Sequence, residues 1–333
     1  MLRKALLELC LVVSVVCSSA LSFAAEGQSP AKVYRIGWLS PQAYVPNVPG
    51  DGNRGTFIRA LNDLGYFEGR NLVIDFRYAE GRNDSLPGRA AELVALKPDV
   101  IMAVTTPGAK AALHATTTIP IVIVQVSDPV GSGLVASLAH PGGNVTGITD
   151  FGIDLAGKYV ELAHLIAPKA TRIGVLITDN PIHPVQLKST QDAAASFGLT
   201  VLPTMDRSDM ELEQAFASLT NEKAGALIVL GGSPMGAQAG RIAELAAQAK
   251  LPALYPDRYF VTKGGLLSYG PTYPDMYLRA AALVDKILKG SKPADLPIEQ
   301  PTRFELVINL KEAKALHLQI PRSVRQRADE LIE

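Results

Sequence analysis

The chain has 333 residues, which is too long for one ordinary hydrophobic core and close to the length of two domains. Its 32 Lys and Arg residues balance its 32 Asp and Glu residues, so there is no net charge to attract nucleic acid. Hydrophobic residues make up 47% of the chain, which excludes a largely disordered protein.

The first 24 residues have the layout of a secretory signal peptide. Arg3 and Lys4 precede an apolar run over residues 11–16, and residues 22–24 (Ser-Phe-Ala) match the small-x-small pattern that precedes cleavage. The apolar run is short and interrupted by serine, so it does not predict a membrane span that remains after processing. The sequence therefore predicts export to the periplasm.

The residue types that most enzymes need are poorly represented after this segment. The two cysteines, Cys10 and Cys17, lie within the predicted signal peptide, so the mature protein has no thiol. The five histidines lack metal-ligand spacing, and no Gly-x-Ser-x-Gly motif is present. We therefore expect no catalytic residue, no metal site and no cofactor.

Strand-like and helix-like segments alternate in the first half of the mature chain. Apolar strand patterns cover residues 32–40, 71–79, 98–106, 119–127 and 144–151, and helical patterns cover residues 55–66, 86–96, 108–115 and a short segment at 133–139. Strands that alternate with crossover helices predict a parallel sheet with helices on both faces.

The same alternation restarts in the second half. Strand patterns cover residues 171–180, 199–205, 224–232, 251–256 and 264–270, and helical patterns cover residues 158–168, 184–198, 209–219, 240–250 and 277–290, with a further segment at 304–318. The predicted fold is α/β, with two doubly wound, flavodoxin-like parallel-sheet lobes joined by strand crossings. We assign residues 32–148 to the first lobe and 149–270 to the second, and expect residues 271–333 to cross back to the first.

Ligands of open parallel sheets bind beyond the carboxyl ends of the strands, where helix N-termini present free N–H groups. We therefore take the residues that follow strands as candidate ligand-binding residues. They are Ser40, Gln42, Tyr44, Thr105, Thr106, Ser127 and Asp128 in the first lobe, and Asp179, Asn180, Gly232, Ser233, Tyr255, Asp257 and Tyr269 in the second. Several of these residues are also ordinary helix caps or turn residues, so each position alone is a weak signal.

The composition of these turns indicates the chemistry of the ligand. Hydroxyls and backbone amides suit a carboxylate, Asp128, Asp179 or Asp257 suits an ammonium group, and tyrosine rings suit an apolar body. The turns contain few arginines, which favours a small organic acid or amino acid over sulfate, phosphate or a metal ion.

Long segments of the chain resemble the substrate-binding proteins of ABC transporters, of the tryptophan and tyrosine type. The resemblance is carried by "YRIGWLS", "FIRALNDLGYFEGRNLVIDFRYAEG", "PDVIMAVTTPGAKAAL", "IPIVIVQVSDPVGSGLVASLAHPGGNVTG" and the stretch from "LLSYGPTY" to "LKEAKAL". It implies a two-lobe clamp of the type I periplasmic-binding-protein class. It also implies ligand contacts at nine positions: Ser40, Thr105, Thr106, Ser127, Asp128, Asn180, Gly232, Ser233 and Tyr269. The turn "GGSP" lacks the acidic residue expected for holding an ammonium group, so the identity of the ligand stays open.

We therefore expect the periplasmic solute-binding component of an ABC importer. Its expected partners are a small-molecule ligand and the membrane permease; we expect no nucleic acid partner, and the protein to be a monomer. Two alternatives remain open on the residues alone. One is a periplasmic sensor that passes its closed state to a signalling receptor, and the other is a secreted flavodoxin-like enzyme.

Overall fold

The structure is a computed structural model, and it describes residues 32–44, 52–206, 209–231, 236 and 238–333. The predicted signal peptide, residues 1–24, lies outside the described residues. All helices and strands discussed here belong to one compact unit, Tyr34–Glu333.

Five parallel strands form the first sheet, in the order β2-β1-β3-β4-β5. The strands are β1 (Tyr34–Ser40), β2 (Leu72–Tyr78), β3 (Val100–Val104), β4 (Ile121–Val126) and β5 (Val145–Thr149). Helices α3 (Leu86–Ala95) and α4 (Thr105–Ala115) cover one face, and α2 (Gly52–Asp63) and α10 (Tyr273–Leu288) cover the other. A short 3₁₀ helix, Asn83–Ser85, precedes α3.

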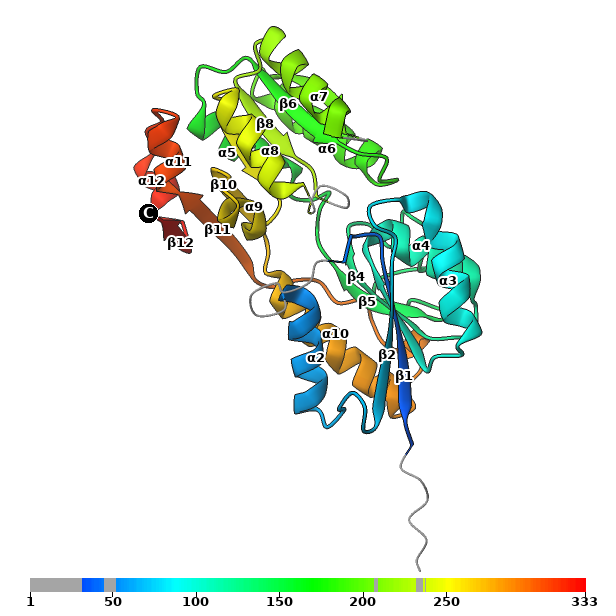
Figure 1. Cartoon of the computed structure of the whole chain (residues 1–333). Coiled ribbons are helices and arrows are strands. Elements are labelled where there is room, and N and C mark those ends of the chain that lie inside the picture. The colour runs from blue at the N-terminus through cyan, green and yellow to red at the C-terminus, as the bar shows by residue number, and fades with distance from the viewer. Residues whose placement is uncertain (1–31, 45–51, 207–208, 232–235, 237) are drawn as a thin grey trace, which may run out of the picture. The chain divides into compact units, whose positions relative to one another are not determined.

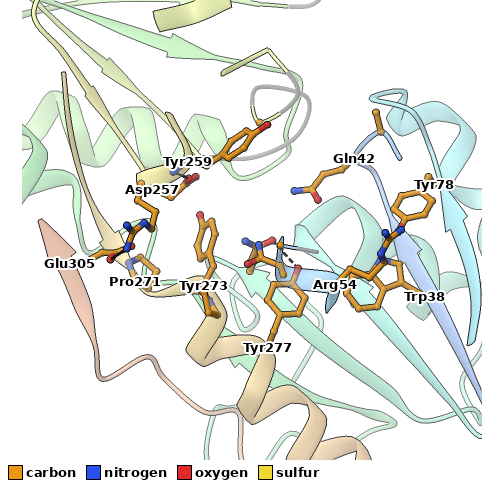
Figure 2. A pocket seen from close by; sticks show the side chains of 17 residues that line it. Trp38, Gln42, Arg54, Tyr78, Asp257, Tyr259, Pro271, Tyr273, Tyr277 and Glu305 are labelled. Carbon is orange, nitrogen blue, oxygen red and sulfur yellow. Dashed lines mark hydrogen bonds and ion pairs between the residues drawn. The ribbon is translucent and has the colours of Figure 1, made fainter. Parts of the chain in front are cut away.

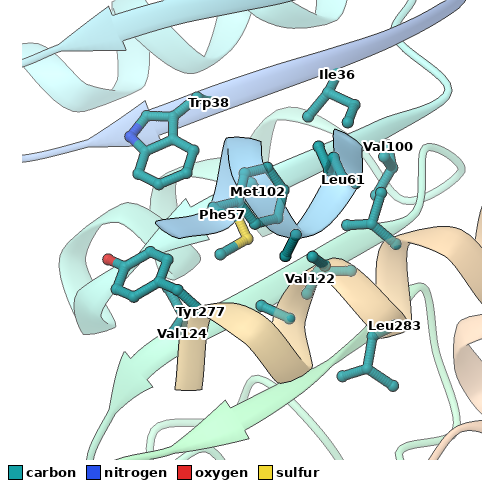
Figure 3. Packing of buried hydrophobic residues seen from close by; sticks show 14 of the residues in the cluster. Ile36, Trp38, Phe57, Leu61, Val100, Met102, Val122, Val124, Tyr277 and Leu283 are labelled. Atoms are coloured by element: carbon teal, nitrogen blue, oxygen red, sulfur yellow. The ribbon is translucent and has the colours of Figure 1, made fainter. Parts of the chain in front are cut away.

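Side chains alternate between the two faces of this sheet, as the pleat of a strand requires. On β3, Met102 points to the cluster beneath α2 and α10, while its neighbours Ile101 and Ala103 point to the cluster beneath α3 and α4. Both faces are apolar, which explains why the strands read as unbroken apolar runs. Figure 3 shows the first of these clusters, with Trp38 and Tyr277 at one end of it.

Seven strands form the second sheet, in the order β12-β11-β10-β9-β8-β6-β7. The strands are β6 (Arg172–Ile177), β7 (Thr200–Met205), β8 (Ala226–Val229), β9 (Ala253–Tyr255), β10 (Leu267–Pro271), β11 (Phe304–Asn309) and β12 (Glu330–Ile332). Only β11 and β10 pair in antiparallel fashion. The helices of this part are α5 (Ala156–Ile166), α6 (His183–Ser196), α7 (Asp209–Asn221), α8 (Ala239–Gln248), α9 (Arg258–Thr262), α11 (Leu310–Ala315) and α12 (Arg322–Arg325).

The two sheets have the same strand order. Within each sheet, the first five strands along the chain lie in the order 2-1-3-4-5, which is the flavodoxin-like doubly wound order. The predicted α/β class with two mostly parallel sheets is therefore confirmed.

The C-terminal part of the chain contributes to both sheets. Helix α10 packs against α2 and the first sheet (Figure 1), and a second 3₁₀ helix, Pro293–Asp295, follows it. The next segment runs beside β5, where Glu299 N–H donates to Gly147 O at 2.8 Å and Glu299 O accepts from Thr149 N–H at 3.0 Å. β11 and β12 then extend the second sheet.

One predicted helix is wrong. Residues 133–139 form turns rather than a helix. Leu134 and Val135 N–H both donate to Pro129 O, and their side chains are buried against the first sheet. A seven-residue segment forms too few helical hydrogen bonds to offset the cost of helix nucleation, so burial of these two side chains decides its conformation.

Candidate functional site: two adjoining cavities

Two adjoining cavities lie at the carboxyl ends of the strands. The larger has a volume of about 290 Å³ and the smaller about 40 Å³. They share five lining residues: Gln42, Gln125, Gly236, Asp257 and Tyr273. A ligand that enters the larger cavity therefore meets the smaller one directly.

The smaller cavity lies at the switch point of each sheet, where the strand order reverses. Its lining includes Gln42 after β1 and Thr105 and Thr106 after β3, and, from the second sheet, Asn180 after β6 and Gly231 after β8. Doubly wound sheets bind ligands at this point because the two neighbouring connections turn to opposite faces and leave a crevice.

Helix α4 presents its N-terminus to the smaller cavity. No side chain caps this end, and Thr105 has a φ of 60°, an uncommon conformation for a β-branched residue. The Thr105 hydroxyl is buried and has no hydrogen-bond partner among the described residues. Free N–H groups at a helix N-terminus and an unpaired hydroxyl together suit a carboxylate.

Two carboxylates, Asp150 and Asp257, line the same cavity. Asp150 follows β5 and accepts a hydrogen bond from Gly152 N–H at 2.9 Å, and burial raises its pKa above the ordinary value. Asp257 precedes α9 and accepts from Tyr259 N–H at 2.8 Å, and burial raises its pKa to about 6. No ion pair among the described residues includes either carboxylate, so each would gain from a cationic group of a ligand.

Tyr273 lies close to both carboxylates. Burial raises the pKa of its phenol well above the usual range, and the negative charges of Asp257 and Asp150 raise it further. The hydroxyl therefore stays protonated and can act as a hydrogen-bond donor.

A buried histidine joins the two loops that the second sheet contributes to the smaller cavity. His183 Nδ1 accepts from Thr178 N–H at 2.7 Å, and Nε2 lies 2.9 Å from Gly231 O. A carbonyl can only accept, so Nε2 carries the proton and the ring is neutral. Burial also lowers the pKa of His183, consistent with this neutral form. The ring therefore fixes the β6 and β8 loops relative to each other.

Five aromatic side chains contribute to the lining of the larger cavity: Trp38, Tyr78, Tyr259, Tyr273 and Tyr277. Tyr273 and Tyr277 come from α10, Trp38 from β1 and Tyr78 from β2. Trp38 stacks on Tyr277 with ring centroids 5.7 Å apart, and both side chains are almost fully buried. In Figure 2 the two α10 tyrosines lie between Asp257 on one side and Arg54 with Trp38 on the other.

Comparison with known proteins identifies the family. A family model described as ABC transporter substrate binding protein matches residues 49–332. The chain belongs to this family. Its members are ligand-binding proteins, which agrees with a site made of cavities.

Three relatives are informative. A "Tyrosine-binding protein" of Clostridioides difficile (strain R20291) is 34% identical over 265 residues, which is 79% of this chain and 76% of the relative. The crystal structure of a conserved domain protein from Vibrio cholerae has a TM-score of 0.83 at 30% identity, covering 90% of this chain and all of the other. An ABC domain from Streptococcus pneumonia in complex with L-Trp has a TM-score of 0.78 at 27% identity, covering 89% of this chain and all of the other. The type I periplasmic-binding-protein fold that the resemblance implies is confirmed.

Six of the predicted ligand-binding residues line the cavities: Gln42, Thr105, Thr106, Ser127, Asn180 and Asp257. Ser40 is buried behind them, where its hydroxyl accepts from Gln42 N–H at 3.2 Å. Ser127 Oγ accepts from Gln186 Nε2 at 3.2 Å, so it also links the turn after β4 of the first sheet to helix α6 beside the second.

The other predicted residues lie elsewhere. Asp128 accepts from Gly131 N–H at 2.7 Å within its own turn, and Asp179 accepts from Asn83 Nδ2 at 3.0 Å. Tyr255, Tyr269 and Tyr44 line neither cavity; Tyr255 stacks on Phe260 and Tyr269 on Phe304, and the Tyr44 ring packs at a tilt against Tyr78. Gly232 and Ser233 lie outside the described residues.

Several lining residues were not among the predicted ones: Arg54, Tyr78, Gln125, Asp150, Tyr273 and Tyr277. Asp150 follows the fifth strand, so the same rule that gave Asp257 could have found it. Tyr273 comes two residues after β10 and could have been found by the same rule, whereas Arg54 and Tyr277 lie within helices, where no strand-end signal marks them.

Two further findings concern the described part of the chain. None of its helices combines the length and the apolar character needed to cross a membrane. Nor does this part bring together three or more His, Cys, Asp or Glu side chains in a group that could bind a metal ion.

Proposed function

We propose that this protein is the periplasmic solute-binding component of an ABC importer and that its ligand is a free amino acid with an aromatic side chain. One observation carries the proposal: a small cavity with an uncapped helix N-terminus and two carboxylates opens into a larger cavity lined by aromatic rings. An α-amino acid has a carboxylate, an ammonium group and a side chain in the same arrangement.

The smaller cavity suits the charged end of the ligand. The α-carboxylate would accept hydrogen bonds from the N–H groups that begin α4 and from the Thr105 hydroxyl, which has no other partner among the described residues. The ammonium group would lie between Asp150 and Asp257. Charge-assisted hydrogen bonds of this kind are about twice as strong as neutral ones.

The larger cavity suits an aromatic side chain. At about 290 Å³ it falls near the lower end of the roughly 300–1,000 Å³ range of small-molecule sites. Trp38, Tyr273 and Tyr277 contribute to its wall, and aromatic pairs add about 0.5–1.5 kcal/mol beyond simple burial.

Two relatives support the ligand class. The C. difficile relative is named for tyrosine, and the Streptococcus structure contains L-Trp. The family match supports a membrane permease as the partner that accepts the ligand, and the signal-peptide pattern of residues 1–24 supports a periplasmic location.

The proposal is tested by calorimetric titration of the mature protein, unfolded and refolded to remove bound ligand, with L-tyrosine, L-phenylalanine and L-tryptophan. We expect one-to-one binding of at least one of them. Asp150→Asn should weaken this binding about 10- to 100-fold, because it removes a charge-assisted hydrogen bond. The matched control is Asp192→Asn, which alters an exposed carboxylate of α6 that pairs with Lys188 on the surface.

The control should bind as the unaltered protein does. If all three amino acids fail to bind the refolded protein, or if Asp150→Asn binds as tightly as Asp192→Asn, the proposed ligand or its assigned position is wrong.

A further inference from the structure

Arg54 projects from α2 into the wall of the larger cavity, at the end farthest from Asp257 (Figure 2). Its guanidinium carbon lies 5.0 Å from the centroid of the Tyr44 ring and 5.7 Å from that of Phe76. The phenol groups of Tyr78 and Tyr44 also lie near it and favour its charged form by raising the pKa of the guanidinium. Aromatic rings therefore pack around the guanidinium.

The positive charge of Arg54 has no negative partner in the part of the chain that the structure describes. The ion pairs of that part do not include Arg54, whereas Arg258, at the other end of the same cavity, pairs with Glu305 at 3.2 Å. A guanidinium has five N–H donors, and two tyrosine hydroxyls cannot use all of them. Arg54 therefore keeps donors for an acceptor that enters the cavity.

Trp38 supplies an independent second donor in the same region. Its side chain is 4% exposed and lines the cavity, yet its indole Nε1–H has no acceptor among the described residues. Figure 3 shows this nitrogen on the same side of the Trp38–Tyr277 stack as the Tyr277 hydroxyl. That hydroxyl donates to Gln125 Oε1 at 3.3 Å, and Gln125 lines both cavities. The Trp38 N–H thus faces the side on which the ligand would lie.

The two ends of the cavity differ in charge. Asp257 and Glu305 lie at one end, and Arg54 and the unpaired Trp38 N–H lie at the other. We infer that the end formed by Arg54 and Trp38 is a subsite for an oxygen acceptor at the tip of the ligand's side chain, either a phenol hydroxyl or a carboxylate on the ring. Arg54 is then the residue that determines specificity. This inference rests on the proposed function, which places the charged end of the amino acid in the smaller cavity.

The subsite predicts discrimination between side chains of nearly the same shape. A ring without an oxygen would cover Arg54 and Trp38 without pairing their donors, and an unpaired buried donor is costly. Sites that hydrogen-bond a ligand hydroxyl reject the analogue that lacks it far more strongly than apolar pockets reject an added group. Because Arg54 is only partly buried, we expect L-tyrosine to bind about 10- to 100-fold more tightly than L-phenylalanine.

The experiment is calorimetric titration of the refolded mature protein with L-tyrosine, L-phenylalanine and 4-carboxy-L-phenylalanine. The three ligands share the amino-acid end and differ only at the tip of the ring. The two oxygen-bearing ligands distinguish a phenol subsite from a carboxylate subsite, according to which of them binds more tightly.

The test variant is Arg54→Met, and its matched control is Arg59→Met, an exposed arginine further along α2. Arg54→Met should weaken binding of the preferred oxygen-bearing ligand about 10- to 100-fold and change L-phenylalanine binding less than about threefold. Arg59→Met should change neither. Trp38→Phe is the second test variant, for use if Arg54→Met does not fold. It keeps an aromatic ring against Tyr277 and removes the N–H, so it should also weaken binding of the oxygen-bearing ligand more than that of L-phenylalanine.

Each failure has its own signature. If the unaltered protein binds no amino acid, the proposed function is wrong and the subsite falls with it. If amino acids bind but Arg54→Met weakens L-tyrosine and L-phenylalanine alike, Arg54 holds the α-carboxylate instead and only the subsite is overturned. Equal affinity of the unaltered protein for L-tyrosine and L-phenylalanine would overturn it as well.

Discussion

Two influences on the Asp257 carboxylate oppose each other in the absence of ligand. Its carboxylate caps α9, which favours the ionised form, but its burial beside both cavities raises the pKa from 3.8 to about 6. Between these two pH values the folded protein holds the proton more tightly than the unfolded chain does. Folding stability from this group is therefore full below pH 3.8 and is lost as pH rises through about 6.

An ammonium group bound to Asp257 would reverse this preference, which gives a pH prediction. Affinity for the amino acid should fall as pH is lowered from 7 to 5, because the ligand must then displace a proton from Asp257. In Asp257→Asn, affinity at pH 7 should be lower and its pH dependence shallower. The pH dependence should not vanish, because burial also raises the pKa values of Asp150 and Glu305.

The same variant should be more stable without ligand. Asparagine still caps α9 but carries no buried charge, so the free energy of unfolding at pH 7 should rise by about 1–2 kcal/mol, a figure reduced for partial solvent exposure. Urea unfolding and calorimetry at pH 5, 6 and 7 measure both effects, with Asp192→Asn as the control. A variant that binds as well as the unaltered protein at every pH would remove Asp257 from the ligand site.

At the scale of elements, an irregularity between β4 and β5 brings Gln125 to the cavities. The parallel register shifts between Ile123 and Val126, and Gln125 has a φ of 58° at this point. Such bulges redirect a side chain and are frequent beside functional sites. On β5, Gly147 pairs with Ile123, immediately before the register shift, and has a φ of 145°.

Gly147→Ala tests this arrangement. A Cβ atom at this position would lie 2.1 Å from the backbone oxygen of Ile123, so the strands would have to separate. We expect the free energy of unfolding to fall by about 3 kcal/mol or more, as for other severe overpacking in a core. Gly143→Ala, where a Cβ meets no atom within 4 Å, is the control and should change stability little. Denaturant unfolding of both variants measures this, and equal stability would contradict the close approach.

How far the sequence leads depends on the kind of element. The strand-to-helix turns could be predicted, because buried parallel strands form apolar runs and their ends are therefore visible; Thr105 and Asn180 were found in this way. Arg54 and Tyr277 could not, because a helical pattern does not reveal which part of a helix will lie beside a cavity. The expectation that residues 271–333 cross back to the first lobe likewise does not say which side chains meet there, such as Tyr277 of α10 and Trp38 of β1.

At the scale of the whole molecule, the first sheet depends on a helix that lies, in the sequence, between two strands of the second sheet. Helix α10 contributes Met276, Tyr277, Ala280, Val284 and other side chains to the core beneath α2. Burial of the larger of these side chains stabilises a fold by about 1.5–3 kcal/mol each, so loss of the helix exceeds the usual margin of stability.

We therefore predict that residues 32–149 do not fold alone. The fragment should lack a cooperative unfolding transition, and a separate peptide covering residues 272–303 should restore one. Trp38, the single tryptophan of the chain, stacks on Tyr277 and so reports the repair by fluorescence. A sharp transition in the isolated fragment would show instead that the first sheet is self-sufficient.

The central claim is that the adjoining cavities capture one free aromatic amino acid, and native mass spectrometry tests it most directly. The refolded mature protein is mixed with all twenty amino acids and a set of small organic acids in equal amounts. We predict a single added mass per chain, equal to that of an aromatic amino acid. An added mass from an organic acid alone, or an unaltered protein mass across the whole mixture, would contradict the claim.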